Sequence, residues 1–253
     1  PTTAGTGSEV TPISIITFSN TEKKGVSSKV ISPDLAILDP ILTSDLPSKT
    51  TASTGIDAMV HAIEAFTSKS KNNNPISKAL AEKSLMLLSD SIIKAVENGK
   101  NDAVARNQML LGSLMAGMSF ANSPVAAVHA LAYPLGGIYK ITHGLSNALI
   151  LPYVIRFNMK DDETRDSYLH LSDIIFPQLK HIKYLEDKTL AFVNEFINLS
   201  KRFNLPTRIR DLGIPKKACK TMSIEAMKQE RLLINNPIRI KQEDALKIYE
   251  QAW

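Results

Sequence analysis

The stretch GIDAMVHAIEAF, residues 55–66, carries an aspartate, Asp57, and a histidine, His61, in an otherwise mostly apolar run. In a helix of about 3.6 residues per turn, positions i and i+4 lie one above the other, so these two side chains can converge on one point. One explanation is a buried Asp–His hydrogen bond, which is the more common arrangement. The other is half of a metal site, which needs further ligands because two do not hold a metal.

Two further histidines extend the pattern. His129, in AAVHALAYPLGG, and His143, in YKITHGLSNA, each lie in an apolar, glycine-containing segment without an obvious partner nearby in the sequence. His170 and His181 lie in polar surroundings, where surface positions are expected. If the helices pack as a bundle, His129 and His143 can reach the face that carries the first pair. Three imidazole nitrogens and one carboxylate oxygen would then surround one point and suit a divalent metal.

Hydrophobic spacing and turn residues predict a short strand-containing region followed by helices. We expect strands over residues 12–18 and 34–40, with residues 19–25 as a hairpin or connecting loop. Capping residues and apolar spacing predict helices from an N-cap at Thr54 to about Thr67, from Asn74 and Pro75 to Gly99, over 102–122, from Pro124, after His143, over 184–204 and over 242–253. Gly112 and Gly117 lie inside the third helix, where glycine costs stability, so we expect close packing there.

Length and composition restrict the class of protein. A chain of 253 residues allows one large domain or two smaller ones, and 43% hydrophobic residues is ordinary for a globular protein. No apolar run approaches the roughly 20 residues that span a bilayer, and no signal pattern opens the chain, so we expect a soluble protein without a membrane partner. The single cysteine, Cys219, cannot form an intramolecular disulfide and has no nearby cysteine or histidine. A cytoplasmic location is therefore expected.

The net charge of +5 is distributed unevenly, with an excess of lysine and arginine between Lys201 and Lys241. Such an excess raises nucleic acid as a partner. However, these basic residues are spread through an apolar helical pattern without interleaved aromatic residues, and the chain matches no nucleic-acid-binding motif. A solvated helix face explains them better, and we expect no nucleic-acid partner.

Three segments, PTTAGTGSEVT, GIDAMVHAIEAF and AVHALAYPLGGIYKITHGLSNALILPYV, resemble the iron-containing alcohol dehydrogenases, whose relatives include lactaldehyde reductase, propanediol dehydrogenase and butanol dehydrogenase. The three motifs occur in the family's order and spacing, and the resemblance runs from Pro1 to the final YEQAW. It implies that Asp57, His61, His129 and His143 bind a divalent metal. The family's metal is Fe2+, and Zn2+ suits the same ligand types.

The resemblance also implies a mainly α fold, with an all-helical, dehydroquinate synthase-like metal domain over residues 42–253 and a short α/β remnant of a nucleotide-binding domain over residues 1–41. We expect the chain to be a fragment that lacks the first half of that nucleotide-binding domain, including its Gly-Gly-Gly-Ser stretch. The cofactor implied is NAD or NADP. The residues implied to contact it are Thr2, Thr3, Thr6, Thr11, Lys23 (or Lys24) and, beside the nicotinamide, Phe120. Without the resemblance these would be turn-capping threonines, a solvated lysine and a core phenylalanine.

Two positions depart from the family pattern. Tyr133 stands where many members have a second histidine, one turn beyond His129. A phenol can donate a hydrogen bond, so we expect Tyr133 to line the substrate cleft without binding the metal; packing where the helix bends is the alternative. Lys29 replaces a common proline and is interpreted as a loop variation.

The function implied is hydride transfer between a nicotinamide and a small alcohol or aldehyde whose oxygen lies on the metal. The alternatives are a glycerol dehydrogenase or maleylacetate reductase type of the same fold, or a metal-binding helical fragment without activity. The complete set of one aspartate and three histidines favours the alcohol branch. A homodimer or higher homo-oligomer is expected.

Overall fold

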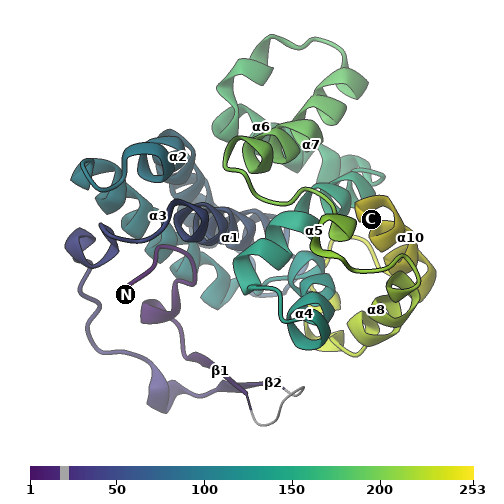
Figure 1. Cartoon of the computed structure of the whole chain (residues 1–253), viewed down its shortest axis with the longest axis horizontal. Coiled ribbons are helices and arrows are strands. Elements are labelled where there is room, and N and C mark those ends of the chain that lie inside the picture. Colours follow the sequence, from purple (N-terminus) through teal and green to yellow (C-terminus); the bar gives the residue numbers. More distant parts are fainter. Residues whose placement is uncertain (18–22) are drawn as a thin grey trace.

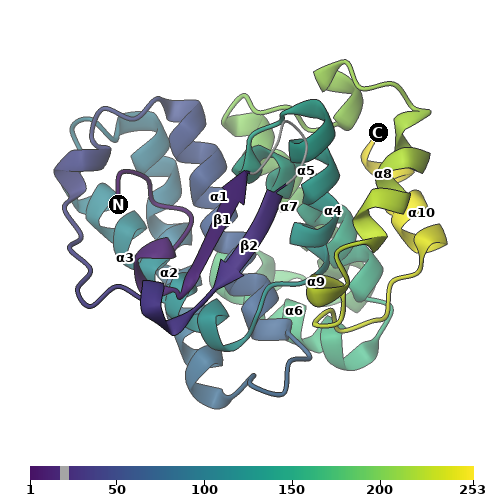
Figure 2. The ribbon, with the colours of Figure 1, turned by 90° about the horizontal axis from the view of Figure 1, so that it is seen from below.

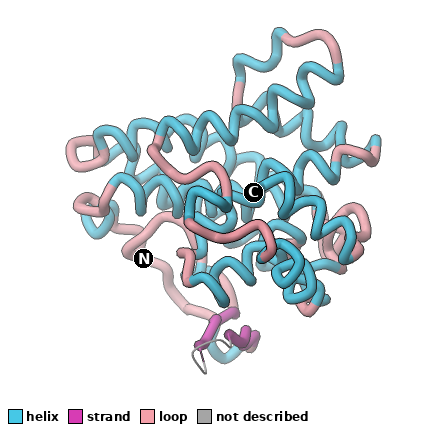
Figure 3. The backbone as a smooth tube through the Cα atoms, turned by 45° about the vertical axis from the view of Figure 1, so that its right-hand side comes forward, coloured by secondary structure: helices cyan, strands magenta, loops and turns pink. Residues whose placement is uncertain are grey.

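A computed structural model describes residues 1–17 and 23–253, with only the backbone described at residues 17, 23 and 24. Helices dominate the described part, so the predicted mainly α fold class is confirmed (Figure 3). The α-helices are α1 (Ser48–Thr67), α2 (Pro75–Asn98), α3 (Ala103–Asn122), α4 (Ala127–Tyr139), α5 (His143–Asn158), α6 (Asp162–Ile175), α7 (Leu185–Arg202), α8 (Ala218–Met227), α9 (Glu230–Leu233) and α10 (Gln242–Ala252). The 3-10 helices are η1 (Ser8–Val10), η2 (Lys29–Ile31), η3 (Pro40–Thr43), η4 (Pro177–His181) and η5 (Ile209–Leu212).

Two strands form an antiparallel hairpin on one face of the helical body (Figures 1 and 2). Strand β1 (Ile13–Thr17) lies inside the predicted first strand and pairs with β2 (Lys23–Ser27), with Ile13 opposite Ser27. The predicted loop over residues 19–25 was wrong for its last three positions, which belong to β2, and its other residues lie outside the described part. A partner adjacent along the chain needs only a short turn to close the pair.

The predicted second strand over residues 34–40 was wrong, because no strand forms there. Leu35 and Ile37 are 77% and 69% exposed, so their side chains have no sheet face to pack against. Strand formation depends on ladder partners and on burial of one face more than on aliphatic composition.

Helix α1 begins earlier than predicted, at Ser48 instead of after Thr54. Thr54 lies inside the helix, and its hydroxyl donates to the carbonyl of Thr50 at 2.9 Å. A bond of this kind to the preceding turn allows threonine to remain helical, so a residue that favours caps did not mark the start.

The other predicted helices are present, with small shifts at their starts. Helix α2 begins at Pro75 with the Asn74 side chain as its cap, as predicted, and α5 begins at His143, one residue before its predicted start. Helix α4 begins at Ala127 instead of at the predicted Pro124. Helices α6, α8 and α9 were not among the predicted elements.

Helix α1 is the central helix of the fold. It packs against α2 and α3 on one side and against α5 and α6 on the other (Figure 1). Its residues are almost all buried from Thr51 to Phe66. Polar side chains in this stretch therefore face other helices rather than water, and need partners there.

The close packing predicted at the two glycines of α3 is confirmed. A Cβ at Gly112 would lie 2.8 Å from Cγ of Leu88 on α2, and one at Gly117 would lie 2.6 Å from the carbonyl oxygen of Gly7. Gly7 itself has a φ of 56°, in the left-handed region that favours glycine. The small residues therefore allow α2 and the N-terminal loop to approach α3.

Among the described helices, none combines the length and apolar character that a membrane span requires.

Candidate metal centre

The four predicted ligands converge from three helices. Asp57 and His61 come from one face of α1, His129 is the third residue of α4, and His143 is the first residue of α5. One potential ligand atom from each residue lies within 4.8 Å of those from the other three. Asp57, His61 and His129 are buried, whereas the His143 side chain is 48% exposed. The cluster is therefore closed on the α1 side and open on the His143 side.

The ring nitrogens of the two buried histidines are oriented by contacts outside the cluster. Nδ1 of His61 lies 3.1 Å from the carbonyl oxygen of Gly5 in the N-terminal loop, and Nδ1 of His129 lies 2.6 Å from Oε2 of Glu64. A carbonyl or a carboxylate oxygen accepts, so in each neutral ring Nδ1 carries the proton and Nε2 presents a lone pair.

These lone pairs provide a test of whether a metal fits. The Nε2 atoms of His61 and His129 lie 3.0 Å apart, and Oδ1 of Asp57 lies 4.0 Å from Nε2 of His129. Acceptors that face one another in a buried site repel unless a cation or a proton lies between them. Three imidazoles and one carboxylate are a donor set for a divalent metal, so the residues present fit one.

The charge states of Asp57 and His61 agree with this fit, whereas the pKa of His129 is raised because the hydrogen bond and charge of Glu64 outweigh its burial. Burial lowers the pKa of His61 to about 3, although the nearby carboxylate of Asp57 opposes that shift. Burial raises the pKa of Asp57, but the three histidines and the Asn147 hydrogen bond outweigh it and hold that pKa below its usual value. Near neutral pH, Asp57 is thus ionised and His61 is neutral, as metal ligands must be.

Sequence reasoning missed two buried polar residues beside the ligands. Asn147 lies on α5, and its Nδ2 is 2.6 Å from Oδ1 of Asp57, 3.2 Å from Nε2 of His129 and 3.3 Å from Nε2 of His143. Its own Oδ1 is buried without a hydrogen-bond partner. Glu64 on α1 is the other, through its contact with His129. Both could have been found by spacing, because Asn147 follows His143 by four positions and Glu64 follows the α1 ligands on the same face.

Phe120 of α3 stacks on His61 of the cluster. The ring centroids are 4.6 Å apart, and the ring planes are inclined by 25°. Phe120 is half-buried, so its ring lies beside the cluster and remains partly accessible. Its contact with a nicotinamide stays a prediction.

The other predicted cofactor residues lie in the N-terminal loop and hairpin. Thr2 and Thr6 are exposed and Thr3 is half-buried, whereas Thr11 is buried with its hydroxyl donating to the carbonyl of Ser8 at 3.4 Å. Through Gly5 the same loop touches the candidate ligand His61. The side chains of Lys23 and Lys24 lie outside the described part of the structure.

Tyr133 is half-buried, one turn beyond His129 on α4. Its hydroxyl accepts a hydrogen bond from Nη2 of Arg231 on α9 at 3.3 Å. The same guanidinium nitrogen lies 3.0 Å from the position that a Cβ at Gly25 of β2 would take. Arg231 therefore lies between Tyr133 and the hairpin.

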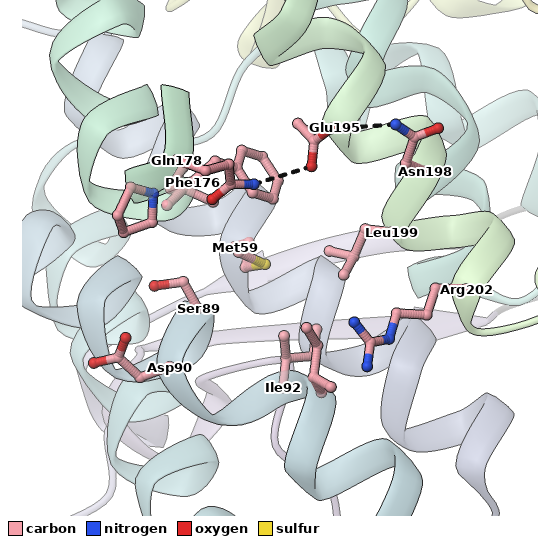
Figure 4. A pocket seen from close by; sticks show the side chains of 13 residues that line it. Met59, Ser89, Asp90, Ile92, Phe176, Gln178, Glu195, Asn198, Leu199 and Arg202 are labelled. Atoms are coloured by element: carbon pink, nitrogen blue, oxygen red, sulfur yellow. Dashed lines mark hydrogen bonds between the residues drawn. The ribbon is translucent and has the colours of Figure 1, made fainter. Parts of the chain in front are cut away.

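A separate cleft of about 350 Å³ lies between α2, η4 and α7 (Figure 4). Its floor includes Met59 and Leu199, and its rim includes Gln178, whose amide donates to Glu195 at 3.1 Å. The lining contains none of the four clustered ligands. The cleft is therefore not assigned to the metal centre.

The chain is similar in sequence to known proteins. A family model described as "Fe-containing alcohol dehydrogenase family, C-terminal" matches residues 51–253, and one described as "Iron-containing alcohol dehydrogenase" matches residues 1–40. Long-chain-alcohol dehydrogenase 1 of Geobacillus thermodenitrificans is 40% identical over 255 residues, which cover 100% of this chain and 62% of that relative. The 1,3-propanediol dehydrogenase of Klebsiella pneumoniae is 34% identical, with 100% of this chain and 64% of that relative covered.

Solved structures show the same similarity. A crystal structure of a 1,3-propanediol oxidoreductase superimposes with a TM-score of 0.91 at 32% identity, covering 100% of this chain and 64% of that one. An alcohol dehydrogenase from Oenococcus oeni gives a TM-score of 0.91 at 33% identity, with the same coverage. The chain thus spans 62% to 64% of the length of these relatives. Since a family model covers most of its length, the chain belongs to the iron-containing alcohol dehydrogenase family.

Proposed function

We propose that this chain supplies the metal-binding and substrate-binding part of an NAD(P)-linked alcohol dehydrogenase or aldehyde reductase. The observation that carries the proposal is the convergence of Asp57, His61, His129 and His143 within 4.8 Å in a chain of this family. Relatives are named for long-chain alcohols, 1,3-propanediol and butanol, which supports an alcohol or aldehyde as the substrate class.

In this proposal the four residues hold one divalent cation, Fe2+ by family membership or Zn2+ by ligand type. A cation bound there would polarise the oxygen of an alcohol or carbonyl. Asp57, His61 and His129 form the buried wall, and the exposed side of His143 leaves an approach for the substrate oxygen. The nicotinamide would supply the hydride chemistry, and the protein would orient the cofactor and the substrate.

We also propose that the residues of the N-terminal loop, the hairpin lysine and Phe120 contact NAD or NADP. The loop contact to His61 and the stacking of Phe120 on the same ring support a cofactor on this side of the cluster. The division into residues 1–41 and 42–253 is part of the proposal, and the separate family models for residues 1–40 and 51–253 support it. A cytoplasmic location and a homo-oligomer remain predictions.

Elemental analysis tests the metal centre directly. We expect one equivalent of divalent metal in the purified chain and a large loss in His143→Ala. His181→Ala is the matched control, because that histidine is exposed on η4 and lies outside the cluster. Equal metal content in the wild type and in His143→Ala would contradict the site.

The reaction is tested by alcohol-dependent reduction of NAD or NADP, measured for this chain and for the chain joined to the N-terminal domain of a relative. If neither protein shows activity although metal is bound, the chain is better explained as a metal-binding helical fragment without catalysis. Activity confined to glycerol would favour the glycerol dehydrogenase alternative.

A further inference from the structure

Glu64 is a buried carboxylate that contacts two consecutive residues of another helix. It lies on α1 with 4% of its surface exposed. Its Oε2 is 2.6 Å from Nδ1 of His129, and its Oε1 is 2.6 Å from the backbone nitrogen of Val128. Both oxygens of one side chain are therefore used at the start of α4.

The contact with Val128 compensates for a helix start that lacks a cap. Ala126 precedes α4 and makes no side-chain capping bond. The first backbone N–H groups of a helix have no partner within it, and a side chain of the preceding residue usually accepts one of them. Here Oε1 of Glu64 accepts the N–H of Val128 from a different helix. A negative charge at this end also complements the helix dipole.

The contact with His129 sets the tautomer of that ring. With Nδ1–H donated to the carboxylate, Nε2 is left as the acceptor that faces His61 and Asp57. A carboxylate behind a ligating imidazole fixes its tautomer and orientation. His61 receives the same kind of support from the carbonyl of Gly5, which has no negative charge.

We propose that Glu64 is the positioning residue of this metal centre, with one oxygen capping α4 and the other holding His129 in the metal-binding tautomer. Glu64 thereby ties the α4 ligand to the helix that carries Asp57 and His61. The inference rests on the proposed metal centre and adds to it a residue that does not itself ligate the metal.

The isosteric variant Glu64→Gln separates the two contacts. Its amide oxygen can accept from Val128, but the NH2 group then faces Nδ1 of His129 and can only donate. The ring must respond by moving its proton to Nε2, where the metal bond forms. If the amide turns the other way, its NH2 group faces the N–H of Val128, and the cap is lost. The variant therefore cannot both accept from Val128 and accept from Nδ1–H of His129.

The measurement is the affinity for Zn2+ by competition with a chromophoric chelator, using the full 253-residue chain. We expect Glu64→Gln to bind Zn2+ about 10- to 100-fold more weakly than the wild type. Nitrogen chemical shifts of His129 in the metal-free protein should report a change from the Nδ1–H to the Nε2–H tautomer. Glu64→Ala should lose affinity and also lower the Tm of the metal-free protein, because it removes the cap as well.

Glu82→Gln is the matched control. Oε1 of Glu82 lies 2.7 Å from Nε2 of His170, a contact of the same kind that joins α2 and α6 outside the cluster. Its Zn2+ affinity should equal that of the wild type.

The outcomes distinguish this inference from the proposed function. A wild-type chain that binds no Zn2+ would refute the metal centre itself. Tight binding by the wild type with unchanged affinity in Glu64→Gln would refute only the role of Glu64, whatever the Tm of the variant.

Discussion

Nε2 of His61 and Nε2 of His129 face each other at 3.0 Å across the boundary between α1 and α4. Each ring uses Nδ1 for a contact outside the cluster, to Gly5 and to Glu64 respectively. Two buried lone pairs at this separation carry a cost that a shared cation removes. The stability of this part of the fold should therefore depend on metal.

The first prediction follows from that relationship. Zn2+ or Fe2+ at about 100 times its dissociation constant should stabilise the chain by about 2.7 kcal/mol, because only the folded state assembles the four ligands. The Tm measured with metal should exceed the Tm measured in EDTA by several degrees. In Asp57→Asn the difference should shrink, because the anionic ligand is lost. An identical Tm in metal and in EDTA would count against the site.

The second prediction concerns the pH dependence of the metal-free protein. The pKa of His61 falls from 6.5 to about 3 on folding, chiefly because the ring is buried. Between these values the unfolded chain binds a proton that the folded chain does not, so the free energy of unfolding should fall as pH falls from about 6.5 towards 3. The loss is on the order of a few kcal/mol.

His129 contributes with the opposite sign. Burial lowers its pKa, but the hydrogen bond and charge of Glu64 raise it by more than burial lowers it, so the net shift is upward. The contribution of His129 to stability is present below pH 6.5 and is lost as pH rises through the raised pKa.

Denaturant titrations in EDTA across the acidic range test the contribution of His61. The free energy of unfolding should fall less steeply with falling pH in His61→Ala than in the wild type. An equal slope in both would contradict the assignment to His61.

A third prediction uses Asn147, whose Nδ2 donates to Oδ1 of Asp57 at 2.6 Å. In Asn147→Asp a second carboxylate would replace this donor and repel the first one in the metal-free protein. We expect a lower Tm in EDTA and a larger increase on adding Zn2+ than in the wild type. Asn147→Ala should lower the Tm in EDTA without the larger metal response. A Tm for Asn147→Asp that is unchanged in EDTA would show that the amide makes no functional bond to Asp57.

The four proposed metal ligands could be predicted because their information is local. Asp57 and His61 share a helix face by spacing alone, and His129 and His143 stand out as histidines in apolar segments. Their convergence depended on the family resemblance, because spacing within a helix does not determine how helices pack. Glu64 and Asn147 also share helix faces with the proposed ligands by spacing, but the contacts they make, between α1 and α4 or α5, do not follow from spacing.

The errors in secondary structure also arise from long-range effects. Leu35 and Ile37 form an aliphatic run that is typical of a strand, but no described neighbour pairs with it. Thr54 is of a residue type that favours helix caps, yet its hydroxyl donates to the carbonyl of Thr50 inside a longer helix. Propensity describes what a residue tolerates, whereas packing decides which of its tolerated states is used.

The fourth prediction tests the close packing of α2 on α3. In Gly112→Ala the new methyl group would lie 2.8 Å from Cγ of Leu88, so we expect a loss of about 1–3 kcal/mol in the free energy of unfolding. Gly136→Ala is the control, because the nearest atom to its new Cβ is the Ile141 carbonyl oxygen at 3.5 Å. That variant should be neutral or stabilised, since alanine favours the helix. Equal stability of the two variants in denaturant titrations would refute the packing argument.

The last prediction concerns Tyr133, whose hydroxyl accepts from Arg231 and whose ring lies one turn beyond His129. If the phenol lines the substrate cleft, Tyr133→Phe should keep its metal content and turn over a few-fold more slowly, a loss on the order of 1 kcal/mol for one hydrogen bond. Arg231→Met should produce a similar decrease if Arg231 orients that hydroxyl, whereas Tyr184→Phe, at an exposed position, should be silent. Loss of metal from Tyr133→Phe would make the phenol a support for the ligands. Full activity in both Tyr133→Phe and Tyr133→Ala would instead show that the ring only packs where α4 contains Pro134.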